Sequence, residues 1–211
     1  FGLTGYQTTI RDVGIIIDSN SDSHIIAKKY FAGGVIGQSF GSLNRIFAVH
    51  DDATQDKIEN NMAKFYGGDT SAPRGILDLF YFEGKNYTQR YIGGLVGVAY
   101  SGSMVVSYSR LNVTSPTTDY AGGIIGGLKL QDTASFQVTV YEGHDFYTKY
   151  YMNEVYATGD VRSKAVKAEQ VDDLTYAGGI VGQIVGEASR VVMMSVNAFN
   201  YIATYDYETK S

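Results

Sequence analysis

One seven-residue string recurs four times in this chain of 211 residues. Each copy has an aromatic residue, a small or apolar residue, two glycines, two branched apolar residues and a third glycine. The copies read FAGGVIG at 31–37, YIGGLVG at 91–97, YAGGIIG at 120–126 and YAGGIVG at 176–182. Such recurrence indicates a repeat architecture, in which each unit adopts the same supersecondary structure and buries its apolar face against its neighbours.

The glycines of this string, here called the Gly-Gly motif, are expected to be structural. Glycine accepts positive φ angles and lets two backbones approach with no Cβ between them. We therefore expect each motif to turn a corner of the chain close to the next unit. The glycines concerned are Gly33, Gly34, Gly37, Gly93, Gly94, Gly97, Gly122, Gly123, Gly126, Gly178, Gly179 and Gly182.

The spacing of the motifs predicts a period of 28–30 residues. The first glycines of the four pairs are separated by 60, 29 and 56 residues. These separations fit one period if two units lack a clean motif. The degenerate string FYGG at 65–68 is a candidate for the first missing unit, and the second would fall near residue 150.

Strand-like segments follow each motif. Runs rich in Val, Phe and Tyr occur at 45–49, 104–108, 136–141 and 190–196, and a third strand of each unit is expected at 111–114, 155–161 and 198–204. Three short strands cannot bury their apolar face alone, but stacked copies pair every backbone group with the unit above and below. The sequence therefore predicts an all-β fold, a β-solenoid (β-helix) of about seven coils.

Residues 1–211 are expected to form a single solenoid segment of a larger protein, because the chain starts with Phe and neither end has an obvious cap. Two segments interrupt the pattern. In 51–67, apolar residues recur at i, i+4 and i+7, which predicts a short amphipathic helical insertion packed on the side of the solenoid, with a partner-binding lobe as the alternative. The segment 142–152 is expected to be a loop insertion.

Three strings of the repeat resemble those of a known family. The GGLVG core after an aromatic or apolar residue, the later YATGDV at 156–161 and the next YAGGIVG at 176–182 are similar to the GLUG repeat of large bacterial surface proteins. The opening FGLTGYQTTIRDVGIII resembles the lead-in coil of that family. The resemblance implies an extracellular or bacterial cell-surface location and an adhesin-like role, and it carries no catalytic residues.

Composition excludes several other classes. The absence of cysteine removes disulfide scaffolds, thiolate zinc sites and thiol nucleophiles. A net charge of −5 without a run of Lys or Arg disfavours nucleic-acid binding. The longest apolar stretches are far shorter than the roughly 20 residues that cross a bilayer, so we expect no membrane span.

Few side chains suggest a chemical site. Asp18, Asn20 and Asp22 have the spacing of the first half of a calcium loop, but Ser23 and Lys29 stand where that loop needs Gly and Glu, so a polar turn is favoured over a calcium site. No other cofactor is expected. The histidines, at 24, 50 and 144, are expected at surface loops.

The 18 tyrosines have two interpretations. Those within the motifs are expected to stack in register as an aromatic ladder along the solenoid. A second group, at 147, 150, 151, 201, 205 and 207, would form an exposed set that could bind sugar or protein.

The expected function is a non-enzymatic one, a rigid stalk that displays loops to a host or cell-surface protein or carbohydrate. Three alternatives stay open. The coils could be an accessory, non-catalytic region of a secreted protease. They could belong to a β-helix polysaccharide-degrading enzyme, for which Arg11, Asp12, Asp160 and Arg162 are the weak candidates. They could also form an extracellular filament by self-association through the solenoid ends.

Overall fold

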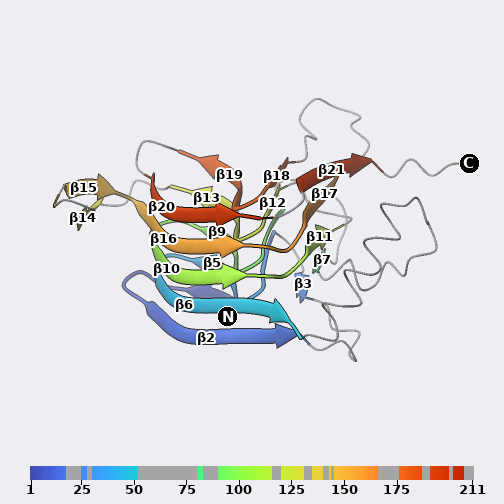
Figure 1. Ribbon diagram of the computed structural model, residues 1–211, viewed down its shortest axis with the longest axis horizontal. Coiled ribbons are helices and arrows are strands. Elements are labelled where there is room, and N and C mark those ends of the chain that lie inside the picture. The colour runs from blue at the N-terminus through green and yellow to red at the C-terminus, as the bar shows by residue number, and fades with distance from the viewer. Residues whose placement is uncertain are drawn as a thin grey trace, which may run out of the picture.

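The computed structural model describes residues 1–17, 25–27, 30–51, 80–82, 90–115, 120–130, 135–139, 143, 145–165, 176–186, 191–199 and 202–206. Within these ranges the chain is all-β, with 21 strands and no helix. The strands form four main parallel sheets and two strand pairs (Figure 1). The fold class predicted from the sequence is therefore confirmed at the level of an all-β chain built from parallel sheets.

The four sheets are named here by their place in the chain. The motif sheet contains β4 (Phe31–Gly33), β8 (Tyr91–Gly93), β12 (Tyr120–Gly122) and β18 (Tyr176–Gly178). The central sheet contains β1 (Leu3–Thr4), β5 (Ile36–Ser39), β9 (Val96–Ala99), β13 (Ile125–Lys129) and β19 (Val181–Val185). The long-strand sheet contains β2 (Thr9–Ile17), β6 (Ser42–His50), β10 (Gly102–Ser109), β16 (Tyr150–Ala157) and β20 (Val191–Ala198). The closing sheet contains β11 (Val113–Ser115), β17 (Val161–Ala165) and β21 (Ile202–Asp206).

Two strand pairs complete the fold. The parallel pair of β3 (Ile25–Ala27) and β7 (Phe80–Phe82) follows the long strands β2 and β6 in the chain, as β11 follows β10, and β7 contacts β11. The antiparallel hairpin of β14 (Phe136–Thr139) and β15 (Asp145–Thr148) lies between β13 and β16 in the sequence. It projects from one end of the sheets (Figure 1).

The chain runs through the sheets in the same order each time. One run through them is called a pass here. Three complete passes run from the motif sheet through the central and long-strand sheets to the closing sheet, and two earlier passes contain β1–β3 and β4–β7. Figure 1 shows the five long strands stacked in chain order from blue β2 to red β20. This arrangement is compatible with a β-solenoid, but the expected count of about seven coils is not confirmed.

The four Gly-Gly motifs are direct neighbours. Gly33 pairs with Gly93, Gly93 with Gly122, and Gly122 with Gly178. The 56-residue separation is a single pass that contains the β14–β15 hairpin, so the unit expected near residue 150 does not separate β12 from β18 in this sheet. The string at 65–68 and the helix expected within 51–67 lie outside the described residues, apart from Asp51.

The motif glycines are needed for close approach. None of those for which contacts are known has a positive φ, so that part of the expectation was wrong. A Cβ on Gly93 would overlap the carbonyl oxygen of Val96 and would lie 2.6 Å from the backbone nitrogen of Gly126 in the next pass. Positive φ angles occur instead at Gly102, the first residue of β10, and at Gly186, which directly follows β19.

The core fills the space between the sheets. It is built from one residue per pass at each inward position, so that Ile36, Val96 and Ile125 follow one another under the central sheet, all fully buried. The motif tyrosines stack as expected: the ring centroids of Tyr91 and Tyr120 are 4.6 Å apart, and those of Tyr120 and Tyr176 are 5.4 Å apart, nearly parallel in both cases. The predicted ladder is confirmed.

Three strand assignments differ from the sequence-based expectation. The run at 136–141 contributes β14 to the hairpin, and the long strand of that pass is β16. The segment 142–152, expected to be a loop, therefore contains β15 and the start of β16, because its aromatic residues pair as readily as those of the earlier run. The string at 155–161 spans the end of β16 and the beginning of β17.

Candidate functional site

Each long strand bends at one column of residues. Asp12, Arg45, Val106, Glu154 and Ser195 all have φ angles between 49° and 59°, in the left-handed region, and they are aligned across the five strands. The bend breaks the alternation of the strand: in β10, Met104 and Ser107 are buried, and the two residues between them face outward. A bend of this kind re-aims the side chains that follow it.

Ser107 supports the bend from inside. Its hydroxyl donates a hydrogen bond to the carbonyl oxygen of Val105 (2.9 Å) and accepts one from the N–H of Ile46 in the preceding pass (3.2 Å). Both backbone groups lie beside the bend. Backbone polar groups near a break in a ladder need a partner of this kind when they are buried.

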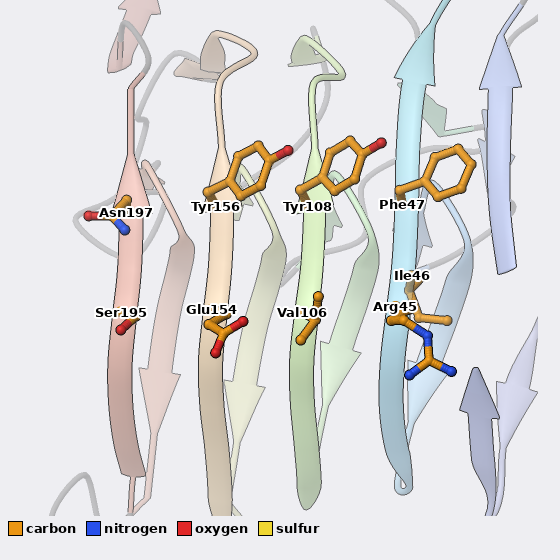
Figure 2. Close-up of a pocket in the computed structure, with 9 residues that line it drawn as sticks. All are labelled: Arg45, Ile46, Phe47, Val106, Tyr108, Glu154, Tyr156, Ser195 and Asn197. Carbon is orange, nitrogen blue, oxygen red and sulfur yellow. The ribbon is translucent and has the colours of Figure 1, made fainter. Parts of the chain in front are cut away.

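A groove follows the bend on the outer face of the long-strand sheet. It has a volume of ≈ 550 Å³ and crosses four strands, from β6 to β20 (Figure 2). One wall is the bend column, and the other is the column two residues further along each strand. The lining residues are Arg45, Ile46, Phe47, Val106, Tyr108, Glu154, Tyr156, Ser195 and Asn197.

Aromatic rings form the second wall. The centroids of Phe47 and Tyr108 are 5.6 Å apart, and those of Tyr108 and Tyr156 are 4.9 Å apart with an angle of 1° between the ring planes. The column ends at Asn197 on one side and at Gly14 on the other, where the Phe47 ring occupies the space that a Cβ would need. Because the ring faces cover one another, a molecule in the groove would meet ring edges and tyrosine hydroxyls.

The charged groups of the groove lie on the opposite wall. Arg45 forms an exposed two-point ion pair with Asp12, in which Nη2 donates to Oδ2 at 2.7 Å. This hydrogen bond holds the pKa of Asp12 below its usual value. Glu154 is exposed two passes further along, and its Oε1 accepts a long hydrogen bond (3.5 Å) from Nδ2 of Asn153. A mostly apolar groove with a few polar groups is typical of a binding surface.

The four candidates for a polysaccharide-degrading site do not come together. Asp12 pairs with Arg45, not with Arg11, on the long-strand sheet. Asp160 lies just before β17 and is 3.4 Å from Nη2 of Arg162, whose side chain is only 5% exposed. The two acid–base pairs belong to different sheets and are three passes apart, since β2 is in the first pass and β17 in the fourth.

The other predicted sites have mixed outcomes. Asp18, Asn20 and Asp22 lie outside the described residues, and the described part of the chain contains no group of three or more potential metal ligands. His50, expected at the surface, is buried at the end of β6, and this burial lowers its pKa to about 4. The loop assignment failed because the strand continues through residue 50. The other two histidines are outside the described residues.

The second group of tyrosines does not form one exposed cluster. Tyr150 is fully buried, Tyr151 is half-buried and Tyr147 is exposed on the hairpin. Residues 201 and 207 and the side chain of residue 205 lie outside the described set. The sequence reasoning missed the outer ladder at 47, 108 and 156, although aligning IFA at 46–48, SYS at 107–109, VYA at 155–157 and VNA at 196–198 would have revealed it.

No helix among the described residues is long and apolar enough to cross a membrane. Comparisons with protein-family models, with curated proteins and with solved structures found no match to this chain. The similarity to the GLUG repeat therefore stays a prediction from the sequence.

Proposed function

We propose that this chain is a non-enzymatic β-solenoid segment of a bacterial extracellular or cell-surface protein. It acts as a rigid stalk that displays side chains and insertions to a host or cell-surface protein or carbohydrate. The observation that carries the proposal is the register of the motif sheet, in which four copies of one string are stacked glycine on glycine. The location rests on the resemblance to surface-protein repeats.

The order of the sheets supports the solenoid. Each pass is one coil, so the chain contributes five coils to the long-strand and central sheets. At a rise of about 4.8 Å per coil these extend over about 24 Å. The coils are joined by backbone contacts too close for a Cβ, by stacked aromatic rings and by a hydrophobic core, and such contacts make a stiff spacer.

Two features support a display role. The β14–β15 hairpin projects from the coils and exposes Phe146 and Tyr147, which are 46% and 66% accessible. The groove on the long-strand sheet adds the edges of Tyr108 and Tyr156. Aromatic residues with a polar tip are enriched where proteins contact partners. The hairpin is the more accessible of the two surfaces, and we assign partner contact to it first.

The test is a binding screen of the whole chain against polysaccharides and cell-surface glycoproteins. We expect the double substitution Phe146→Ala and Tyr147→Ala to abolish binding without changing the melting temperature. Ile16→Ala, which removes an equally exposed apolar side chain from β2, should leave binding intact. Cleavage of a polysaccharide that is lost in Asp160→Ala would contradict the proposal and favour the enzyme alternative.

One observation favours a second function, the extracellular filament. The central and long-strand sheets end at β1 and β2 on one side and at β19 and β20 on the other. Leu3, Ile16, Ile184 and Met193 are exposed on these terminal strands. Exposed strand edges with apolar side chains favour pairing with another chain. Sedimentation would show concentration-dependent association if the ends pair, and a monomer at all concentrations would contradict this alternative.

A further inference from the structure

One end of the groove on the long-strand sheet combines a carboxylate with an aromatic ring. Glu154 and Tyr156 both line the groove and are two residues apart on β16 (Figure 2). Glu154 is exposed, and among the described residues it has no ion pair and a single long hydrogen bond, from Asn153. This end of the groove therefore has a negative charge that no described residue neutralises.

The stacked rings of the groove stop beside this carboxylate. Tyr156 is paired in register with Tyr108 on one side and with Asn197 on the other. The Tyr108 ring covers one face of Tyr156, with the centroids 4.9 Å apart. Figure 2 shows both tyrosine rings inclined toward the preceding pass, and Asn197 supplies no ring to continue the stack. The last ring of the stack thus keeps one face for a ligand.

Two contacts elsewhere in the same sheet show what such groups hold. In the bend column, the Asp12 carboxylate forms a two-point ion pair with the guanidinium of Arg45. On the stacked rings, the guanidinium carbon of Arg110 lies 5.8 Å from the ring centroid of Tyr108. A carboxylate of the bend column and a ring of the stack each hold an arginine side chain in the earlier passes.

The pass that contains Glu154 lacks such an arginine. By the pairing of β10 with β16, Thr158 takes the place that Arg110 has in the preceding pass. In the bend column, the neighbours of Glu154 are Val106 and Ser195, which are both uncharged. The carboxylate and the open ring face are therefore both available to one guanidinium from outside.

We propose that Glu154 and Tyr156 bind an arginine side chain of a partner protein. The planar guanidinium stacks on the open face of Tyr156 and donates two hydrogen bonds to the Glu154 carboxylate, a combination that a lysine ammonium does not reproduce. The side-chain oxygen of Asn197 is a further acceptor at the same end of the groove. Charge complementarity favours this partner, because the chain has a net charge of −5. The site does not depend on the stalk function or on the hairpin contact.

The rest of the groove sets what should lie next to the arginine. Beyond Glu154 the groove is lined by the apolar side chains of Val106, Ile46 and Phe47, and it ends at Arg45, which already has an ion pair. Apolar side chains of the partner would bury surface against this stretch, whereas a second cation would meet Arg45. The expected partner segment therefore has one arginine followed by apolar residues.

The experiment is a calorimetric titration of the 211-residue chain with three blocked peptides. The first is acetyl-Arg-Leu-Leu-amide, and the others have citrulline or lysine in place of arginine. Citrulline has nearly the same shape as arginine without its charge. We expect the arginine peptide to bind with a 1:1 ratio and about tenfold or more tightly than either of the others. Equal affinity of the arginine and citrulline peptides, or no saturable binding of the arginine peptide, would overturn the proposal.

Three variants locate the site. Glu154→Gln should remove the preference for arginine over citrulline, and Tyr156→Leu should reduce the preference for arginine over lysine, because each removes one of the two contacts. Asp145→Asn is the matched control: it removes an exposed carboxylate from the hairpin with the same change in net charge, and it should keep both preferences. Melting temperatures should show that all three variants are folded. An arginine preference that survives in Glu154→Gln, or that is lost equally in Asp145→Asn, would refute the assignment.

Discussion

The substitution Gly93→Ala tests the role of the motif glycines most severely. The new Cβ would overlap the Val96 carbonyl oxygen and would lie 2.6 Å from both the Gly126 nitrogen and the Ile124 carbonyl oxygen. All three atoms belong to backbone, in the same pass and in the next, so no change of side-chain rotamer relieves the overlap. The φ angle of Gly93 is not in the left-handed region, and the cost therefore comes from packing alone.

The expected loss of stability is large. Overpacking against side chains costs about 1–3 kcal/mol, and contact with fixed backbone on two passes should reach at least the top of that range, about 3 kcal/mol. Urea unfolding monitored by circular dichroism measures the loss. Gly5→Ala is the matched control, because its Cβ would have only an ordinary contact with Thr8 Oγ1 at 3.7 Å, and it should be neutral or stabilising.

The reasoning would be refuted if Gly93→Ala unfolded within about 0.5 kcal/mol of the parent chain, the range of ordinary surface substitutions. Equal losses for Gly93→Ala and Gly5→Ala would also refute it. Either result would mean that the two passes are not packed backbone to backbone at the motif.

Three further predictions concern single side chains. Val106 is a β-branched residue with a φ of 50°, so Val106→Asn should raise the free energy of unfolding by about 1 kcal/mol, whereas Val105→Asn beside it should not. The hydroxyl of Tyr150 is buried without a hydrogen-bond partner among the described residues, so Tyr150→Phe should be neutral or stabilising by about 1 kcal/mol in the same assay. Burial lowers the pKa of His50 from 6.5 to about 4, so the unfolded chain binds the proton first, and about 3 kcal/mol of stability present above pH 6.5 should be lost as the pH falls to 4. His50→Leu should lack this part of the loss in urea unfolding at pH 7 and pH 4, and an identical pH dependence in both proteins would contradict the burial of the ring.

The motif predicted that its copies stack on one another but not the number of passes. Identical strings stack best on one another, and this is why Gly33, Gly93, Gly122 and Gly178 are neighbours. The separations of 60 and 56 residues are close to twice 29, so spacing alone cannot distinguish two passes from one pass with an insertion. Only the register between strands resolves the two cases.

The groove was harder to predict because its geometry does not depend on residue type. The bend column contains an aspartate, an arginine, a valine, a glutamate and a serine, and of these only the aspartate is a residue type enriched at positive φ. The available signal was the spacing of inward residues: Leu43 and Ile46, like Met104 and Ser107, are three apart instead of two. An extra residue between two inward positions indicates a bend in the strand.

The order of the passes is tested most directly by engineered disulfides, because the chain has no cysteine of its own. Asn44, Val105 and Asn153 face outward at the same register position of β6, β10 and β16. Neighbouring strands are about 4.8 Å apart and alternate strands about 9.6 Å apart, whereas a disulfide needs Cα atoms within about 7 Å. We predict rapid oxidation for the cysteine pairs 44/105 and 105/153 and none for 44/153. Fast cross-linking of 44/153, or failure of both adjacent pairs, would contradict the stacking of successive passes on which the whole account depends.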